Sequence, residues 1–199
     1  MSQLVLASQS PRRTQLLEKA GFSFTSIPIS TSELIDRKLN PDAQILSITR
    51  QKLEAAEKAI LHLSKEDTTV VVADTEVQFK DELLGKPQNK DHSNEIIRRL
   101  SGNFHFVKTA VIVKNIKTKI EVSHIETSLV QFRTLDEEEI RAYVNSGEGS
   151  DKAGSYAIQG LGRALVKFHR GSQSNIVGLP VEYLSPLLEN YFKIPKRTL

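Results

Sequence analysis

Two arginines lie at the start of an expected helix, where acidic residues are usually favoured. Pro11 suits the first helical position after an N-cap at Ser10, and Arg12 and Arg13 follow it directly. The macrodipole is already positive at this end, so each cation costs about 0.3–1 kcal/mol relative to a favourable charge. Helix N-termini bind anions, and guanidinium forks match phosphate oxygens. With the hydroxyls of Ser8 and Ser10, the stretch predicts a phosphate site; the alternative is that both arginines are solvated.

An aspartate at the end of an apolar run is the second candidate. Residues 69–75, TVVVADT, are rich in β-branched side chains and typical of a strand buried on both faces. Ligands gather beyond the carboxyl ends of strands in α/β sheets. Asp74 is therefore well placed to hold a divalent cation or to activate water. The alternative is that Asp74 starts the turn toward a hairpin at Lys80–Asp81.

Three further charged residues would complete such a site. Lys86 lies in LGKP, just before a proline and therefore in an extended or turn setting. Lys52 lies on a long expected helix, and Glu33 lies in the loop before it. Together they would supply two more cations for phosphate oxygens and one more acid for a metal. Taken singly, each fits a solvated surface group.

The stretch SDKAGSYAIQGLG, residues 150–162, is rich in glycine, which lets backbone approach a ligand closely. Gln159 can bond both a donor and an acceptor on a base edge. Tyr156 suits either stacking on a base or filling the core. The stretch is not a P-loop, because the spacing GxxxxGK[ST] is absent.

Composition excludes several classes of site. The sequence of 199 residues has no cysteine, so disulfides and thiolate chemistry are excluded, and its five histidines show no close pairing that would indicate zinc. A net charge of +3 is too small to indicate a nucleic-acid partner. The N-terminus lacks the apolar segment of a signal peptide, and no run approaches the length of a membrane span. We expect a cytoplasmic protein without a nucleic-acid or membrane partner.

Strand and helix patterns alternate irregularly along the chain. The expected strands are 4–7, 23–29, 69–75, 104–113, 120–132 and 164–168. The expected helices begin at Pro11, 42, Asp91 and Pro180, and a further one follows a capping box of Thr134 and Glu137; the second runs to 63 and the last to Tyr191. This mixture predicts an α/β fold: an elongated mixed sheet with flanking helices and two lobes around a cleft.

Four stretches together resemble the Maf proteins, a family of nucleoside triphosphate pyrophosphatases. They are LVLASQSPRRTQLLEKAGFSF, VVVADTEVQFKDELLGKP, LSGNFHFVKTA and DKAGSYAIQGLG with SNIVGLPV, in order from residue 3 to 188. The resemblance implies a fold like that of the inosine triphosphate pyrophosphatases, with 1–199 as a single Maf-type domain of two lobes, and a homodimer. It also implies hydrolysis between the α- and β-phosphates, with Mg²⁺ or Mn²⁺.

The resemblance implies roles for particular residues. Asp74 matches the proposed proton acceptor of the family. The other positions that match the family motifs are Ser8, Ser10, Arg12, Arg13, Glu33, Lys52, Lys86, Asp151, Lys152 and Gln159. We expect the metal to bind between Asp74, Glu33 and phosphate oxygens, while Lys52 and Lys86 act with the arginines to offset the charge of the triphosphate.

The resemblance also indicates a branch of the family. Arg12, Thr75 and Gln159 match the branch that acts on dTTP and UTP, whereas another branch, with different residues there, prefers 7-methyl-GTP. Glu76 departs from the family pattern, because an aliphatic residue is usual at that position, and so does the helix segment ITRQKLEA. The alternatives are a pyrophosphatase for 7-methyl-GTP or another non-standard nucleotide, and a non-catalytic regulator of division that senses nucleotide.

Overall fold

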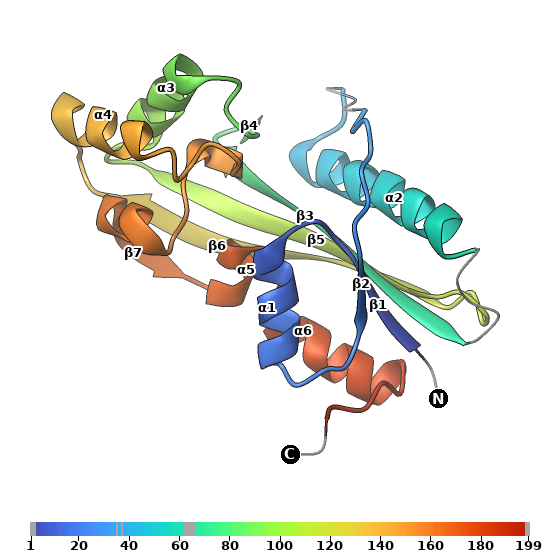
Figure 1. Ribbon diagram of the computed structural model, residues 1–199. Helices are drawn as coiled ribbons and strands as arrows, with labels where there is room; N and C mark the ends of the chain where they lie inside the picture. Colours follow the sequence, from blue (N-terminus) through green and yellow to red (C-terminus); the bar gives the residue numbers. More distant parts are fainter. Residues whose placement is uncertain (1–2, 35, 37, 62–66, 198–199) are drawn as a thin grey trace. The chain divides into compact units, whose positions relative to one another are not determined.

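The computed structural model describes residues 3–34, 36, 38–61 and 67–197 (Figure 1). Its elements are, in order, β1 (Gln3–Ala7), α1 (Pro11–Lys19), β2 (Thr25–Ile27), α2 (Pro41–Ile60), β3 (Thr68–Phe79), β4 (Glu82–Leu84), α3 (Lys90–Leu100), β5 (Phe104–Asn115), β6 (Glu121–Phe132), α4 (Glu137–Ser146), η1 (Ala153–Ser155), η2 (Gly160–Leu165), β7 (Val166–Arg170), α5 (Gln173–Val177), α6 (Val181–Pro186) and η3 (Leu187–Tyr191).

The chain forms two compact units. Unit 1 comprises Met1–Asp74, Thr109–Glu126 and Gly178–Leu199, and unit 2 comprises Thr75–Lys108 and Thr127–Val177. Within the described residues, seven strands form one mixed sheet in the order β2-β1-β3-β5-β6-β7, with β4 paired to β3. The mixed α/β sheet with flanking helices confirms the fold class expected from the sequence.

In unit 1 the parallel strands β1 and β3 bury both faces. One face, with Leu4 and Leu6 of β1, packs against Leu17 of α1 and against α6 and η3. The opposite face, with Val5 and Ala7, packs against α2. Figure 1 shows α2 on one side of these strands and α1 and α6 on the other. Side chains alternate between the two faces of a strand, and helices cover both faces here. This is why each of these strands has a continuous run of apolar residues.

Unit 2 has its own core. Val77 and Phe79 of β3 and Val107 of β5 pack with residues of α3, α4 and β6 in one cluster. The hairpin expected at Lys80–Asp81 is confirmed, since Phe79 pairs with Glu82 across a two-residue turn. The strand that ends unit 1 at Asp74 thus continues into a separately packed core.

The expected elements are largely confirmed, and their ends shift. The second helix begins at Pro41 rather than 42, with Asn40 as its N-cap, and its expected residues 62–63 lie outside the described part of the chain. Strand β3 continues to Phe79, beyond the expected end at Thr75. The strand expected at 23–29 is reduced to Thr25–Ile27. Gly147 ends α4 in the left-handed conformation, as expected.

Some predicted details are wrong. The capping box consists of Asp136 and Glu139, not Thr134 and Glu137, because the Asp136 carboxylate accepts the N–H groups of the first turn and Glu139 returns to the Asp136 N–H. The strand expected at 164–168 runs over Val166–Arg170, after a 3₁₀ turn. The short helix α5 was not predicted, since five residues give too little periodicity to recognise. Among the described helices, none has the length and apolar character needed to cross a membrane.

Candidate active site

Strands β1 and β2 end at one edge of unit 1, whereas β3 continues to Phe79, so Asp74 lies within β3 and not at its end as expected from the sequence. Leu6 of β1 pairs with Val71 of β3, and Ala7 pairs with Ile27 of β2. Parallel pairing brings residues beyond the paired parts of these strands to the same edge. They are the turn Ser8–Ser10 after β1, the segment with Glu33 after β2, and Asp74, three residues beyond Val71 in β3.

Strand alternation directs Asp74 toward helix α2. Val70 and Val72 pack on the α2 face of β3, so the side chain at position 74 points to the same face. There the Lys52 ammonium, on α2, donates to Asp74 Oδ1. Asp74 is buried, with 6% of the residue exposed, and no described residue offers its other carboxylate oxygen, Oδ2, a hydrogen bond.

Glu33 completes this group of charges. Its carboxylate lies 2.8 Å from Lys52 Nζ, so one ammonium binds two carboxylates. Glu33 has a backbone φ of 34°, which is uncommon outside glycine. The backbone N–H and C=O of the next residue, Leu34, both bond the Gln51 side chain at 2.9 Å. Helix α2 therefore fixes the loop that carries Glu33. The structure brings Glu33, Lys52 and Asp74 together.

The N-terminus of α1 has no side-chain cap. Ser10 is the N-cap, as expected, but its side chain makes no capping hydrogen bond. The buried Ser8 hydroxyl instead accepts the Ser10 N–H at 3.1 Å, which fixes the turn. Arg12 lies in the first helical turn, where acidic residues are absent. These features fit the anion site predicted from the sequence.

Arg13 also has a structural contact. Its Nε donates to the carbonyl oxygen of Gly178 at 2.7 Å, which ties α1 to the start of the C-terminal segment. Gly178 itself has a φ of 125°. Arg13 therefore helps to hold unit 1 together.

The remaining predicted residues belong to unit 2. Thr75 is half-buried in β3, and Lys86 is exposed. The Gly154 N–H donates to the Gly85 carbonyl at 3.1 Å, so the stretch carrying Lys86 lies beside the glycine-rich stretch. A Cβ on Gly154 would lie 2.6 Å from Val77 Cγ2, which explains the glycine there. Glu76 lies near Gly85, whose Cβ would be 3.9 Å from Glu76 Oε2.

The glycine-rich stretch is tied to the core of unit 2. Tyr156 is buried, and its hydroxyl bonds His105 Nε2 at 2.8 Å, so it fills the core rather than offering a stacking surface. Ser155 and Ser93 share a short hydroxyl–hydroxyl bond. Burial lowers the pKa of His105 to about 3, so this ring is neutral at ordinary pH.

The predicted binding residues of this stretch lie at its two ends. Lys152 Nζ lies 2.5 Å from both Asp151 Oδ1 and the Glu148 carbonyl oxygen. Gln159 is exposed at the N-cap of η2, and its side chain makes no capping bond. The Glu148 carboxylate accepts the Leu161 N–H at 2.8 Å. Sequence reasoning missed Glu148, because a single glutamate after a helix carries no pattern.

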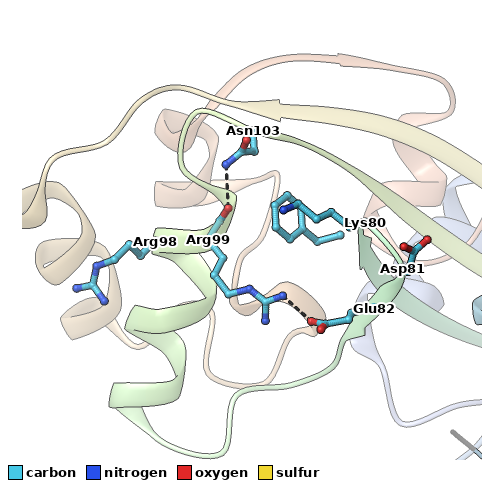
Figure 2. A pocket seen from close by; sticks show the side chains of 7 residues that line it. Lys80, Asp81, Glu82, Arg98, Arg99 and Asn103 are labelled. Carbon is cyan, nitrogen blue, oxygen red and sulfur yellow. Dashed lines mark hydrogen bonds and ion pairs between the residues drawn. The ribbon is translucent and has the colours of Figure 1, made fainter.

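A shallow pocket of about 550 Å³ lies elsewhere in unit 2 (Figure 2). It is lined by Phe79, Lys80, Asp81, Glu82, Arg98, Arg99 and Asn103. Arg99 pairs with Glu82 at 2.5 Å, and Arg98 pairs with Glu137 at 2.7 Å. Figure 2 shows the first of these pairs as a dashed line. Both arginines therefore bind carboxylates of neighbouring elements.

Comparisons with known proteins agree with the residues described above. Residues 3–191 match the model of a family described as Maf-like protein. The dTTP/UTP pyrophosphatase of Bdellovibrio bacteriovorus is 44% identical over 189 residues, which cover 94% of this chain and 98% of that protein. The protein of the same name from Desulfitobacterium hafniense is 39% identical over 186 residues, covering 93% and 83%. The resemblance seen in the four sequence stretches is confirmed.

A solved structure is more distant. The nucleoside-triphosphatase / dITP/XTP pyrophosphatase from Mycobacterium abscessus is 13% identical, with a TM-score of 0.40 over 66% of this chain and 73% of that one. A TM-score this low does not establish a shared fold.

Proposed function

Because the chain belongs to the Maf-like protein family, we propose that it hydrolyses dTTP and UTP to the nucleoside monophosphate and pyrophosphate. The names of its relatives support this substrate class. The observation that carries the chemistry is the buried Asp74 carboxylate, with one oxygen bound to Lys52 and the other without a partner among the described residues. The match of Arg12, Thr75 and Gln159 to the pyrimidine branch supports dTTP and UTP over 7-methyl-GTP.

The triphosphate tail is proposed to bind at the N-terminus of α1. The helix N–H groups, the Ser10 hydroxyl and Arg12 would bind phosphate oxygens, and their positive charge would offset repulsion of the attacking water. Asp74 Oδ2 would accept a proton from that water as its oxygen forms a bond to the α-phosphorus. The bond from the α-phosphorus to the bridging oxygen then breaks, and pyrophosphate leaves.

The donors at this edge fit a hard divalent cation. The described residues contain no group of three His, Cys, Asp or Glu side chains that would form an all-protein metal site. Mg²⁺ is commonly held by one or two carboxylates plus substrate phosphates, and Asp74 and Glu33 are the carboxylates that would hold it here. A bound Mg²⁺ or Mn²⁺ would add positive charge beside the phosphate oxygens. Calorimetric titration with Mn²⁺ should detect binding that Asp74→Asn weakens.

Residues of unit 2 have proposed roles that rest on the family resemblance. Lys86 would bind phosphate oxygens, and Gln159 would read the edge of the pyrimidine base. Asp151 and Lys152 would hold the N-terminal end of the glycine-rich stretch, residues 150–162. We also propose that residues 1–199 act as one Maf-type domain with two lobes, which a single cooperative unfolding transition would support.

The proposal includes a homodimer in the cytoplasm, where the triphosphates are used. Phe104 and Phe168, exposed by 52% and 42%, are in edge-to-face contact with ring centroids 6.3 Å apart in unit 2. Exposed apolar groups of this kind often mark interfaces. Light scattering of the parent and of Phe104→Ser should show a dimer that the substitution weakens. Cell fractionation would test the location.

Turnover of dTTP and UTP with Mg²⁺, measured as pyrophosphate and monophosphate by ion-exchange chromatography, tests the function. Asp74→Asn should lower turnover by about 100-fold or more, because it removes the proton acceptor. The matched control is Asp81→Asn, in the exposed hairpin turn of unit 2. If Asp74→Asn hydrolyses dTTP like the parent, the role of Asp74 is wrong. Preferred turnover of 7-methyl-GTP, or no turnover, would favour one of the alternatives.

A further inference from the structure

We propose that Glu148 is a positioning residue for nucleotide selection, because it holds both ends of the stretch that carries Lys152 and Gln159. The inference rests on the proposed function, in which Gln159 contacts the base. Glu148 itself touches no reacting group in this proposal. It acts on the backbone within unit 2.

The carboxylate of Glu148 binds the backbone immediately after Gln159. Its Oε2 accepts the Leu161 N–H at 2.8 Å, and Oε1 accepts the Gly162 N–H at 3.4 Å. These are the N–H groups of the first turn of η2, for which Gln159 is the N-cap residue. Since the Gln159 side chain does not cap this turn, the Glu148 carboxylate takes over the capping role. The Gln159 amide is thereby left for a ligand.

The backbone of Glu148 binds the other end of the stretch. Its carbonyl oxygen accepts a hydrogen bond from Lys152 Nζ at 2.5 Å, beside the ion pair with Asp151. The Lys152 side chain is only 16% exposed, so these contacts restrict its conformation. Residue 148 thus contacts Lys152 through its backbone and the turn after Gln159 through its carboxylate.

Glu148 is itself anchored to helix α4. The helix ends at Gly147, and the Glu148 N–H donates to Ser146 Oγ at 3.3 Å. From the same helix, Tyr143 Oη accepts the Ala157 N–H at 3.2 Å. Helix α4 therefore holds the stretch at two points on either side of Gln159. This rigidity is what discrimination between similar bases requires, since small displacements of a recognition group weaken selectivity.

The substitutions Glu148→Gln and Glu148→Asp test this role. Gln keeps the length of the side chain but replaces one acceptor by a donor that faces an N–H group. Asp keeps the charge but is one methylene shorter. The matched control is Glu137→Gln, at the first position of α4, which loses an exposed ion pair with Arg98 of α3. For each variant, kcat and KM are measured for dTTP, UTP, dCTP and GTP, with melting temperature.

We expect both Glu148 variants to raise KM for dTTP about 10-fold, with a smaller change in kcat, and to reduce the preference for dTTP over dCTP and GTP. Amide hydrogen exchange at residues 160–162 should become faster. In a Gln159→Ala background, Glu148→Gln should have no further effect on preference, because Glu148 acts through Gln159. The control should resemble the parent.

Three results would overturn the inference. The first is a parent-like KM and preference in both variants, even with faster amide exchange. The second is an equal, additive loss of preference in the Gln159→Ala background. The third is loss of folding in both variants, which would make Glu148 a stability residue. A parent that does not hydrolyse dTTP or UTP at all is a distinct outcome, since it rejects the proposed function before any variant is compared.

Discussion

The Lys52 ammonium on helix α2 binds the Asp74 carboxylate on strand β3 within unit 1. The two residues are 22 positions apart in the sequence. They meet because Asp74 points to the face of β3 that packs against α2, as Val70 and Val72 do. Lys52 also binds Glu33 at 2.8 Å. A single cation therefore holds together the two carboxylates on which the proposed chemistry depends.

Lys52→Met is expected to reduce both stability and turnover. The substitution leaves Asp74 buried beside Glu33 without a cation, and removing one partner of a buried polar pair costs about 1–3 kcal/mol. Turnover of dTTP should fall about 100-fold, because positive charge near the phosphates is lost. Urea unfolding and pyrophosphate release measure the two effects. Lys52→Arg, which keeps the charge, should retain more stability, and an unchanged turnover in Lys52→Met would contradict the proposed role.

Arg12→Ala and Arg13→Ala test the two arginines at the start of α1. Arg12→Ala is expected to weaken dTTP binding about 10-fold, because a hydrogen bond to a charged group is worth about 1.5–3 kcal/mol. Arg13→Ala should also lower the free energy of unfolding, since its bond to the Gly178 carbonyl is lost. Nucleotide titration and urea unfolding separate the two. An Arg13→Ala variant with the free energy of unfolding of the parent would contradict the structural role of Arg13.

Gly154→Ala should destabilise unit 2 through steric overlap. Gly154 has a φ of 66°, and its Cβ would lie 2.6 Å from Val77 Cγ2, so strain and overpacking add to about 1–3 kcal/mol or more. Gly147→Ala is the matched control. Its φ of 74° is similar, but a Cβ there would meet no described atom within 4 Å. Thermal unfolding should show the larger loss for Gly154→Ala, and equal losses would mean that Val77 moves aside.

Stability should depend on pH through His105. Burial lowers its pKa from 6.5 to about 3, so the folded state favours the neutral ring. The stabilisation is complete above pH 6.5 and is lost as pH falls toward 3, because the unfolded chain then binds the extra proton. Between pH 7 and pH 5 the free energy of unfolding of the parent should fall by about 2 kcal/mol through this residue. The His105→Gln variant should not show this decrease. Parallel pH profiles of unfolding in urea would contradict this account.

Local sequence signals identified most elements and the family. The periodic apolar residues of 42–63 predicted helix α2, because Ile45, Ile48, Leu53, Ala56 and Ile60 share one face and are all buried. The β-branched run predicted β3 as a strand with two buried faces. Element ends were less predictable. Thr134 and Glu137 fitted the capping-box spacing as well as Asp136 and Glu139 do, and local spacing cannot choose between them.

The sequence by itself identified Arg12, Arg13 and Asp74 as candidate site residues. The two arginines are cations at the positive end of a helix, and Asp74 is a carboxylate that follows an apolar, β-branched run. The tertiary structure decided which of them meet. Strand alternation directs Asp74 toward Lys52. Packing of helices and loops gives Arg13 its bond to Gly178 and makes Glu148 the acceptor for Leu161. These contacts join residues 13 to 165 positions apart, and no local pattern encodes such distant pairs.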